Sequence, residues 1–143
     1  WAGTRLRAMT EAAMAPFIPE GGEGLRVDGP DMTIGPHAAL SLALALHELG
    51  TNAVKHGALS VPGGTVSLGW QIDPEGRFRL DWTERGGPAP VATGRRGFGS
   101  RLLLEVLPQQ LGGTAALALH PEGAAFRLET TAAALNDQPE APH

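Results

Sequence analysis

The sequence predicts an α/β protein, a two-layer α/β sandwich in which helices cover one face of a mixed, mostly antiparallel sheet. Four stretches between residues 66 and 128 alternate apolar and polar residues, a pattern typical of half-buried strands. One long stretch before them has the periodicity of an amphipathic helix. Because strands with one apolar face must be covered, the helices are expected to pack on that face.

A short helix is predicted at residues 4–15, closed by Pro16. Its apolar side would comprise Leu6, Met9 and Ala13.

Glycine and proline then mark a loop at residues 18–24. Two short strands are predicted after it, at residues 25–27 and 32–34, around a turn at residues 28–31.

The central helix is predicted within residues 41–60 and is expected to end near Gly57. Pro36 lies just before it, where proline favours the opening of a helix. At about 100° per residue, four apolar side chains share an arc about 60° wide, which must pack on something apolar. They are Leu42, Leu46, Leu49 and Ala53.

Glu48, Asn52 and Lys55 form a polar column on the same helix, about 120° from the apolar arc. A carboxylate, an amide and a cation at this spacing can supply a base, a metal-ligating oxygen and a phosphate-binding charge along about 10 Å. The alternative is a solvated face with an ordinary charge pair. Lys55 is the only lysine in the chain.

Two hairpins are predicted after the central helix. Their turns, at residues 73–76 and 120–123, have proline and glycine where tight turns need them. The alternating apolar positions of the four strands are Val66, Leu68, Trp70 and Ile72, then Phe78, Leu80 and Trp82, then Ala115, Leu117 and Leu119, and finally Phe126 and Leu128.

The segment 84–101 contains five glycines and two prolines, so it is either a functional loop or a plain connector. Residues 97–100 run into a helix predicted at 100–111 and would leave backbone N–H groups free where an anion can bind. Arg101 brings positive charge to the same place. The same glycines would also suit a tight turn.

Length and composition indicate one globular domain, with 143 residues of which 42% are apolar. A net charge of −4 and a pI near 5.7 provide no basic field for nucleic acid. The chain has no cysteine, which excludes disulfides, thiolate metal sites and cysteine nucleophiles. No apolar run reaches the roughly 18 residues of a transmembrane helix. Residues 136–143 are expected to be a frayed or disordered tail.

Missing motifs exclude several enzyme classes. His47-Glu48 begins like a zinc-protease helix, but the residue four positions after His47 is Thr51, not a second ligand. The sequence also has no Gly-x-Ser-x-Gly nucleophile elbow, no P-loop and no dinucleotide-binding fingerprint.

Four other side chains, His47, His56, Trp82 and Glu84, are candidates for a role at or beside a site. His47 is expected to hydrogen-bond rather than react, and His56 to cap the end of the helix. Trp82 is expected to be a core residue rather than a ligand platform. Glu84, where its strand opens into the loop, could accept a hydrogen bond from the amino group of a base.

Three segments, residues 47–60, 82–88 and 97–102, resemble the catalytic and ATP-binding domain of the HWE group of bacterial sensor histidine kinases. That group is named for a histidine in the N box and a Trp-x-Glu in the first glycine box. It belongs to the GHKL superfamily, and the resemblance therefore implies the Bergerat ATP-binding fold.

The resemblance implies a binding site for ATP and Mg²⁺. Asn52 would hold Mg²⁺ between the phosphates, and Glu48 would be the base or polarising carboxylate near the γ-phosphate. Glu84 would read the adenine amino group, where relatives use an aspartate, and segment 88–96 would be the ATP lid. The other implied contacts are Lys55 and His56 beside the phosphates, Gly86 and Gly87 for close approach, Gly97, Phe98, Gly99 and Ser100 in the second glycine box, and Arg101 on a phosphate.

The resemblance also implies an activity and partners. The domain, residues 21–132, would transfer the γ-phosphate of ATP to a histidine on a separate dimerisation domain, to which residues 1–20 would be the end of a linker. Residues 133–143 would be a disordered tail. The isolated domain is expected to bind ATP without autophosphorylating. A response regulator receiver domain, a homodimeric intact protein and a cytoplasmic location are implied, with the parent protein either soluble or membrane-anchored.

Two alternatives stay open. Glu48 and Asn52 also suit the activation of water, so the domain could be a GHKL ATPase or an anti-sigma-type serine kinase. It could also be a degenerate nucleotide-binding module that works by docking to a partner.

Overall fold

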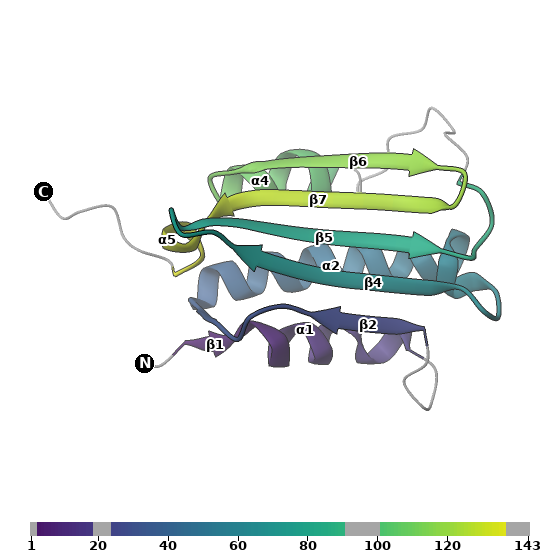
Figure 1. Ribbon diagram of the computed structural model, residues 1–143, viewed down its shortest axis with the longest axis horizontal. Coiled ribbons are helices and arrows are strands. Elements are labelled where there is room, and N and C mark those ends of the chain that lie inside the picture. The colour runs from purple at the N-terminus through teal and green to yellow at the C-terminus, as the bar shows by residue number, and fades with distance from the viewer. Residues whose placement is uncertain (1–2, 19–23, 91–100, 137–143) are drawn as a thin grey trace, which may run out of the picture.

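A five-stranded mixed sheet forms one layer of the protein, and helices form the other (Figure 1). The computed structural model describes residues 3–18, 24–90 and 101–136. The predicted two-layer α/β sandwich is confirmed. In chain order the elements are β1 (Thr4–Arg5), α1 (Leu6–Met14), the 3₁₀-turn η1 (Ala15–Phe17), β2 (Leu25–Asp28), β3 (Thr33–Ile34), α2 (Pro36–His56), the 3₁₀-turn η2 (Ala58–Ser60), β4 (Thr65–Ile72), β5 (Arg77–Arg85), the π-helix η3 (Leu102–Val106), α4 (Leu107–Gln110), β6 (Thr114–His120), β7 (Gly123–Thr131) and α5 (Ala132–Leu135).

The strands of the main sheet lie in the order β2-β4-β5-β7-β6. β2 runs parallel to β4, and every other neighbouring pair is antiparallel. Both predicted hairpins, β4–β5 and β6–β7, are present. The inner face of the sheet buries Val66, Leu68, Trp70, Phe78, Leu80, Trp82, Phe126 and Leu128, which confirms the predicted alternation at these positions. The prediction is wrong at Ile72 and Leu119, which are exposed at the ends of their strands.

The turn between β4 and β5 is held by its own sequence. The Asp73 carboxylate accepts hydrogen bonds from the backbone N–H groups of Glu75, at 3.0 Å, and Arg77, at 2.9 Å. Gly76 has a φ of 84°, a conformation that side chains other than glycine rarely adopt. The turn therefore fixes the register in which Leu68 faces Trp82.

The outer face of the sheet carries charged side chains. Arg127 donates a hydrogen bond to Asp81 at 2.7 Å, and Arg79 lies 3.3 Å from the same carboxylate. The hydrogen bond from Arg127 to Asp81 and the attraction between the two charges raise the pKa of Arg127.

Helix α2 is the longest helix described, at 21 residues. It begins at Pro36, five residues before the stretch singled out in the sequence, because proline suits the first helical position. Its predicted apolar arc is confirmed, since Leu42, Leu46, Leu49 and Ala53 are all buried. The 3₁₀-turn η1 also packs on α2, where a Cβ at Gly50 would overlap the Phe17 ring.

The N-terminal segment differs in part from its prediction. Residues 4 and 5 pair with β3 in a two-stranded sheet, and α1 starts only at Leu6. Its fully buried residues are Leu6, Thr10 and Met14, while Met9 and Ala13 are partly buried. The buried stripe is thus displaced from the predicted one and includes a threonine that hydrophobicity could not indicate.

Strands β2 and β3 belong to different sheets rather than to one hairpin. The segment between them lies against Trp70, whose indole N–H donates to the Pro30 carbonyl at 2.8 Å. A Cβ at Gly29 would overlap the same indole. These contacts hold the segment along the sheet, so β3 does not fold back onto β2.

The predicted helix at 100–111 is present from Arg101 in the described residues, but it is not a regular α-helix. Its central part is the π-helix η3, where the Leu107 N–H donates to the Leu102 carbonyl. Pro108 has no backbone N–H, and in an α-helix its ring would crowd the Leu104 carbonyl. The wider π-turn before Pro108 accommodates this proline.

The chain remains folded up to α5. Leu135, which falls within the predicted tail 133–143, is fully buried, and its carbonyl accepts a hydrogen bond from the Gly35 N–H at 2.8 Å. Residues 137–143 lie outside the described part of the chain. Among the helices that the structure describes, none is both long enough and apolar enough to cross a bilayer.

Candidate functional site

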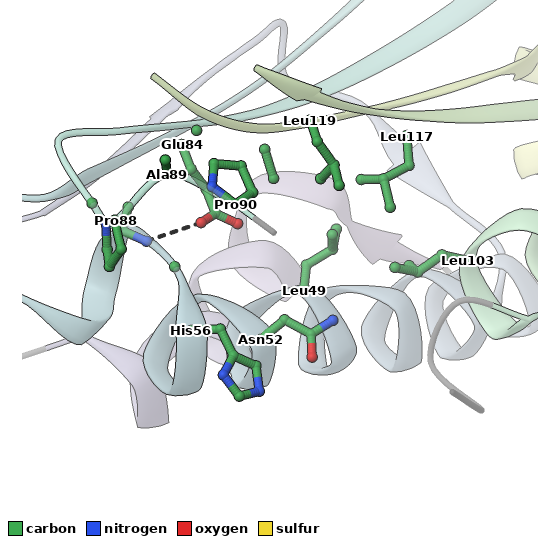
Figure 2. Close-up of a pocket in the computed structure, with 15 residues that line it drawn as sticks. Leu49, Asn52, His56, Glu84, Pro88, Ala89, Pro90, Leu103, Leu117 and Leu119 are labelled. Carbon is green, nitrogen blue, oxygen red and sulfur yellow. Dashed lines mark hydrogen bonds between the residues drawn. The ribbon is translucent and has the colours of Figure 1, made fainter. Parts of the chain in front are cut away.

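A cavity of about 490 Å³ lies between the C-terminal half of α2, the end of β5 and the β6–β7 hairpin (Figure 2). Its walls are mostly apolar, and three polar side chains enter them: Asn52, His56 and Glu84. The complete lining is Leu49, Asn52, His56, Gly57, Ala58, Glu84, Gly87, Pro88, Ala89, Pro90, Leu103, Leu117, Leu119, Gly123 and Ala124.

Helix α2 supplies one wall through Leu49, Asn52 and His56 (Figure 2). Residues at i, i+3 and i+7 share one side of a helix, and these three positions have that spacing. Leu49 is buried, whereas Asn52 and His56 are exposed. The helix therefore presents an amide and an imidazole beside an apolar surface.

The predicted polar column meets the cavity only at Asn52. Glu48 and Lys55 lie toward an adjoining side of α2 and do not line the cavity. Glu48 is half-buried and Lys55 is exposed. Their assignments near the phosphates remain predictions.

Glu84 is the buried polar group of the cavity, with 6% of its surface exposed. Its Oε1 accepts a hydrogen bond from the Ala58 N–H at 3.0 Å, drawn dashed in Figure 2. Its Oε2 accepts one from the Trp82 indole N–H at 2.9 Å. The ion pairs formed by the described residues do not include Glu84. The carboxylate is thus held by two neutral donors.

The alternation of β5 places Glu84 on the inner face of the sheet. Phe78, Leu80, Trp82 and Glu84 are buried in turn along this strand, so the carboxylate continues the row of core side chains. The apolar row ends in a charged group at the edge of the cavity. Such a group is expected to meet hydrogen-bond donors.

Two glycines leave room for Glu84. A Cβ at Gly57 would overlap its Oε1, and a Cβ at Gly123 would overlap its backbone carbonyl oxygen. Gly57 lies at the end of α2 and Gly123 begins β7. Three elements therefore converge on this residue.

Gly86 and Gly87 lie close to neighbouring backbone. Gly86 has a φ of 79°, and a Cβ at Gly87 would lie 2.6 Å from the Ala58 Cα. Gly87 lines the cavity whereas Gly86 does not. The contact of Gly87 with Ala58 brings the segment after β5 against the turn after α2. The close approach of a ligand at Gly86 and Gly87 stays a prediction.

His47 and Trp82 lie outside the lining of the cavity. His47 is exposed, and its ring lies 5.3 Å from that of Phe17 in an edge-to-face arrangement. Trp82 is fully buried in the core. Its indole N–H donates a hydrogen bond to Glu84, which does line the cavity.

Part of the predicted phosphate-binding segment lies outside the described residues, namely Gly97, Phe98, Gly99 and Ser100. Arg101 is exposed and lies 3.9 Å from the Glu105 carboxylate. It does not line the cavity.

Sequence reasoning missed Gly57, Ala58 and Gly123. The sequence predicts Gly57 only as the end of a helix and Gly123 only as part of a turn. Their contacts with Glu84 join residues 26 or more positions apart in the chain, and no local pattern could indicate them. The apolar wall formed by Leu117 and Leu119 was predicted only as a strand.

The arrangement suits a largely apolar ligand that carries an N–H donor. An ionised carboxylate only accepts hydrogen bonds and has about four acceptor positions, of which the protein uses two here. The remaining positions can accept from a ligand inside the cavity. Cavities with apolar walls and a few fixed polar groups are typical of small-molecule sites.

Comparisons with known proteins agree with this fold. No protein-family model matches the chain. The blue-light-activated histidine kinase of Brucella anthropi is 41% identical over 126 residues, which are 86% of this chain and 26% of that protein. The chain thus spans about a quarter of the length of the curated relatives it matches.

Two solved structures show the same fold. The blue-light-activated histidine kinase of Erythrobacter litoralis superposes with a TM-score of 0.72 and 20% identity, over 93% of this chain and 41% of that one. The catalytic domain of the histidine kinase ThkA gives 0.64 and 13%, over 90% and 94%. These likenesses show the fold, and the 41% identity to a curated histidine kinase places the chain in the histidine kinase family.

Proposed function

We propose that the cavity binds the adenine of ATP and that the domain, within its intact protein, transfers the γ-phosphate to a histidine of another domain. The observation that carries this proposal is the Glu84 carboxylate, buried in an apolar cavity and fixed by two N–H donors. Asn52 and His56 line the same cavity from α2. The chain's homology to histidine kinases supports the same function.

Glu84 is proposed to read the base. Its free acceptor positions fit the 6-amino group of adenine, which is a donor. Guanine has a carbonyl oxygen at that position, and two acceptors facing each other in a buried site are unfavourable. The apolar residues Leu49, Leu103 and Leu117 line the same cavity and would pack on the faces of the ring.

Asn52 is proposed to hold Mg²⁺ through its side-chain carbonyl oxygen. Mg²⁺ prefers oxygen ligands and usually keeps several waters, with one or two protein ligands and the substrate phosphates completing its shell. The described residues contain no group of three or more metal-ligating histidine or acidic side chains. A single amide oxygen at the edge of the cavity fits the sparse protein contribution that a Mg²⁺–nucleotide complex needs. The bound ion would neutralise phosphate charge.

The remaining roles concern phosphoryl transfer. Glu48 is proposed to act as the base or polarising carboxylate, with Lys55, His56, Arg101 and the segment 97–100 around the phosphates. Transfer of this kind depends mostly on positioning and charge neutralisation, so a site without a covalent nucleophile is sufficient. The acceptor histidine is proposed to lie on a dimerisation domain of the whole protein, with a response regulator receiver domain as the next acceptor.

The Asn52→Ala variant tests the nucleotide site. Because the amide oxygen is the proposed ligand of Mg²⁺, we expect Mg²⁺-dependent ATP binding to fall below detection in calorimetry. The matched control is Asn136→Ala, at the only other asparagine of the chain, which is exposed beyond α5. Its ATP affinity should equal that of the wild type. Unchanged affinity in Asn52→Ala would remove the metal assignment.

A second assay separates transfer from hydrolysis. The domain is incubated with ATP and a purified dimerisation domain of a related histidine kinase, and both phosphohistidine and free phosphate are measured. Phosphohistidine on the added domain supports the kinase. Phosphate release at enzymatic turnover without transfer would instead indicate a GHKL ATPase.

A further inference from the structure

We propose that Trp82 is a positioning residue whose indole N–H fixes the Glu84 carboxylate and thereby sets the selectivity of the cavity for adenine. This inference rests on the proposed function, because it concerns how the same cavity recognises its base. It assigns to a fully buried core residue a measurable effect on ligand choice.

Two hydrogen bonds hold the carboxylate of Glu84, one on each oxygen. The Trp82 indole N–H bonds Oε2 at 2.9 Å from within β5, and the Ala58 N–H bonds Oε1 at 3.0 Å from the turn after α2. A rotation of the carboxylate about its terminal bond would break both hydrogen bonds. The plane of the carboxylate, and with it the direction of its free acceptor positions, is therefore fixed before a ligand enters.

The indole N–H of Trp82 meets the Glu84 carboxylate in a buried position. Trp82 is 0% exposed and its hydrogen bond to Oε2 is buried, so this side of the carboxylate faces the core rather than bulk water. A hydrogen bond to a charged group contributes more than one between neutral groups. Without the indole donor, Oε2 would lack its protein partner, and the carboxylate would be free to turn about its remaining bond to Ala58.

A fixed carboxylate discriminates between ligands better than a mobile one. A site built to accept a hydrogen bond from a ligand rejects an analogue that lacks the donor, because the buried acceptor is then left unpaired. A carboxylate that can turn finds other hydrogen-bond partners. An analogue without the donor then no longer leaves an acceptor unpaired and is rejected less strongly. Removing the indole N–H is thus expected to weaken binding only of ligands that donate to Glu84.

Trp70 provides a matched control within the same sheet. It is also buried, and its indole N–H also donates a hydrogen bond, to the Pro30 carbonyl at 2.8 Å. Trp70 does not line the cavity, and its indole N–H bonds Pro30 rather than Glu84. A phenylalanine at either position removes an indole N–H and a similar volume, but only the change at Trp82 removes a donor to Glu84.

The experiment compares Trp82→Phe and Trp70→Phe with the wild type by calorimetry in the presence of Mg²⁺. The two ligands are ATP and purine riboside triphosphate, which lacks the 6-amino group. We expect Trp82→Phe to lose about tenfold in affinity for ATP, the loss typical of one charge-assisted hydrogen bond. Its affinity for the analogue should stay within about twofold of the wild type. The ratio of the two affinities should be unchanged in Trp70→Phe.

Each outcome decides the matter. Equal losses for both ligands in Trp82→Phe, or an unchanged ratio, would show that Trp82 serves only the core and would overturn the inference. A wild-type domain that binds neither ligand would instead overturn the proposed function. If Trp82→Phe does not fold, benzothienylalanine is placed at position 82, because it has the shape of tryptophan with a sulfur atom in place of the N–H. The same fall in the ratio is then expected.

Discussion

Glu84 accepts hydrogen bonds from two N–H donors, and this limits which side chains can replace it. In Glu84→Gln one end of the amide is itself a donor, so it must face either the Ala58 N–H or the Trp82 indole N–H. One buried N–H then loses its partner. We expect the free energy of unfolding to fall by about 1–3 kcal/mol, measured by urea denaturation, together with weaker ATP binding.

The control for this variant is Glu122→Gln, which makes the same change at an exposed position between β6 and β7. Its free energy of unfolding should lie within about 0.5 kcal/mol of the wild type. A Glu84→Gln domain as stable as this control would contradict the two-donor arrangement.

At the scale of single residues, the sequence predicted part of the site. Asn52, His56, Glu84 and Gly87 were predicted and do line one cavity. The helical and strand periods that orient Asn52, His56 and Glu84 are local, which explains why the sequence could place these three side chains on the faces that line the cavity. The contact of Gly57 with Glu84 depends on how α2 and β5 meet, and no local period contains that information.

Among the elements, the β4–β5 hairpin depends on Asp73. Its carboxylate accepts two backbone hydrogen bonds in the turn, so Asp73→Ala should lower the free energy of unfolding by about 1 kcal/mol. The ion pair of Asp73 with Arg77 is exposed and adds little. The measurement is urea denaturation.

Glu75→Ala is the control for the turn, because that side chain is exposed in the same turn and only its backbone N–H bonds Asp73. An equal loss of stability in both variants would mean that the Asp73 cap contributes nothing of its own.

The success of the element predictions follows the strength of the local pattern. Helix α2 and the strands β4 and β5 were predicted because their apolar periods are long and uninterrupted. The π-helix was not predicted, because the wide turn before Pro108 satisfies a backbone constraint that hydrophobicity does not express. The pairing of β1 with β3 involves two residues on each side, too few for any period.

For the molecule as a whole, the core extends through α5. Leu135 is fully buried, so Leu135→Ala should lower the free energy of unfolding by about 2–5 kcal/mol through lost burial and the cavity left behind. Urea denaturation measures this loss. Leu40→Ala is the matched control, since Leu40 on α2 is 62% exposed and should cost about 0.5 kcal/mol or less.

A small effect of Leu135→Ala, similar to that of Leu40→Ala, would instead place the C-terminal boundary of the domain at residue 132, as the sequence predicted. The sequence does not predict α5, because its four residues include three alanines and have no amphipathic pattern. The helix is held by Gly35 and by the core, which are distant in the chain.

The elements β1 and α5 lie at one end of the sheet, and the C-terminal ends of α2 and β5, which line the cavity, lie at the other (Figure 1). The Gly35 N–H, directly after β3, donates to the Leu135 carbonyl in α5. Because β3 pairs with β1, this hydrogen bond keeps β1 and α5 at the same end of the sheet. A fluorescent label or an affinity handle fused before β1 or after α5 would therefore leave the mouth of the cavity uncovered. The domain could be immobilised on a sensor surface by either end, with the opposite end facing the solution.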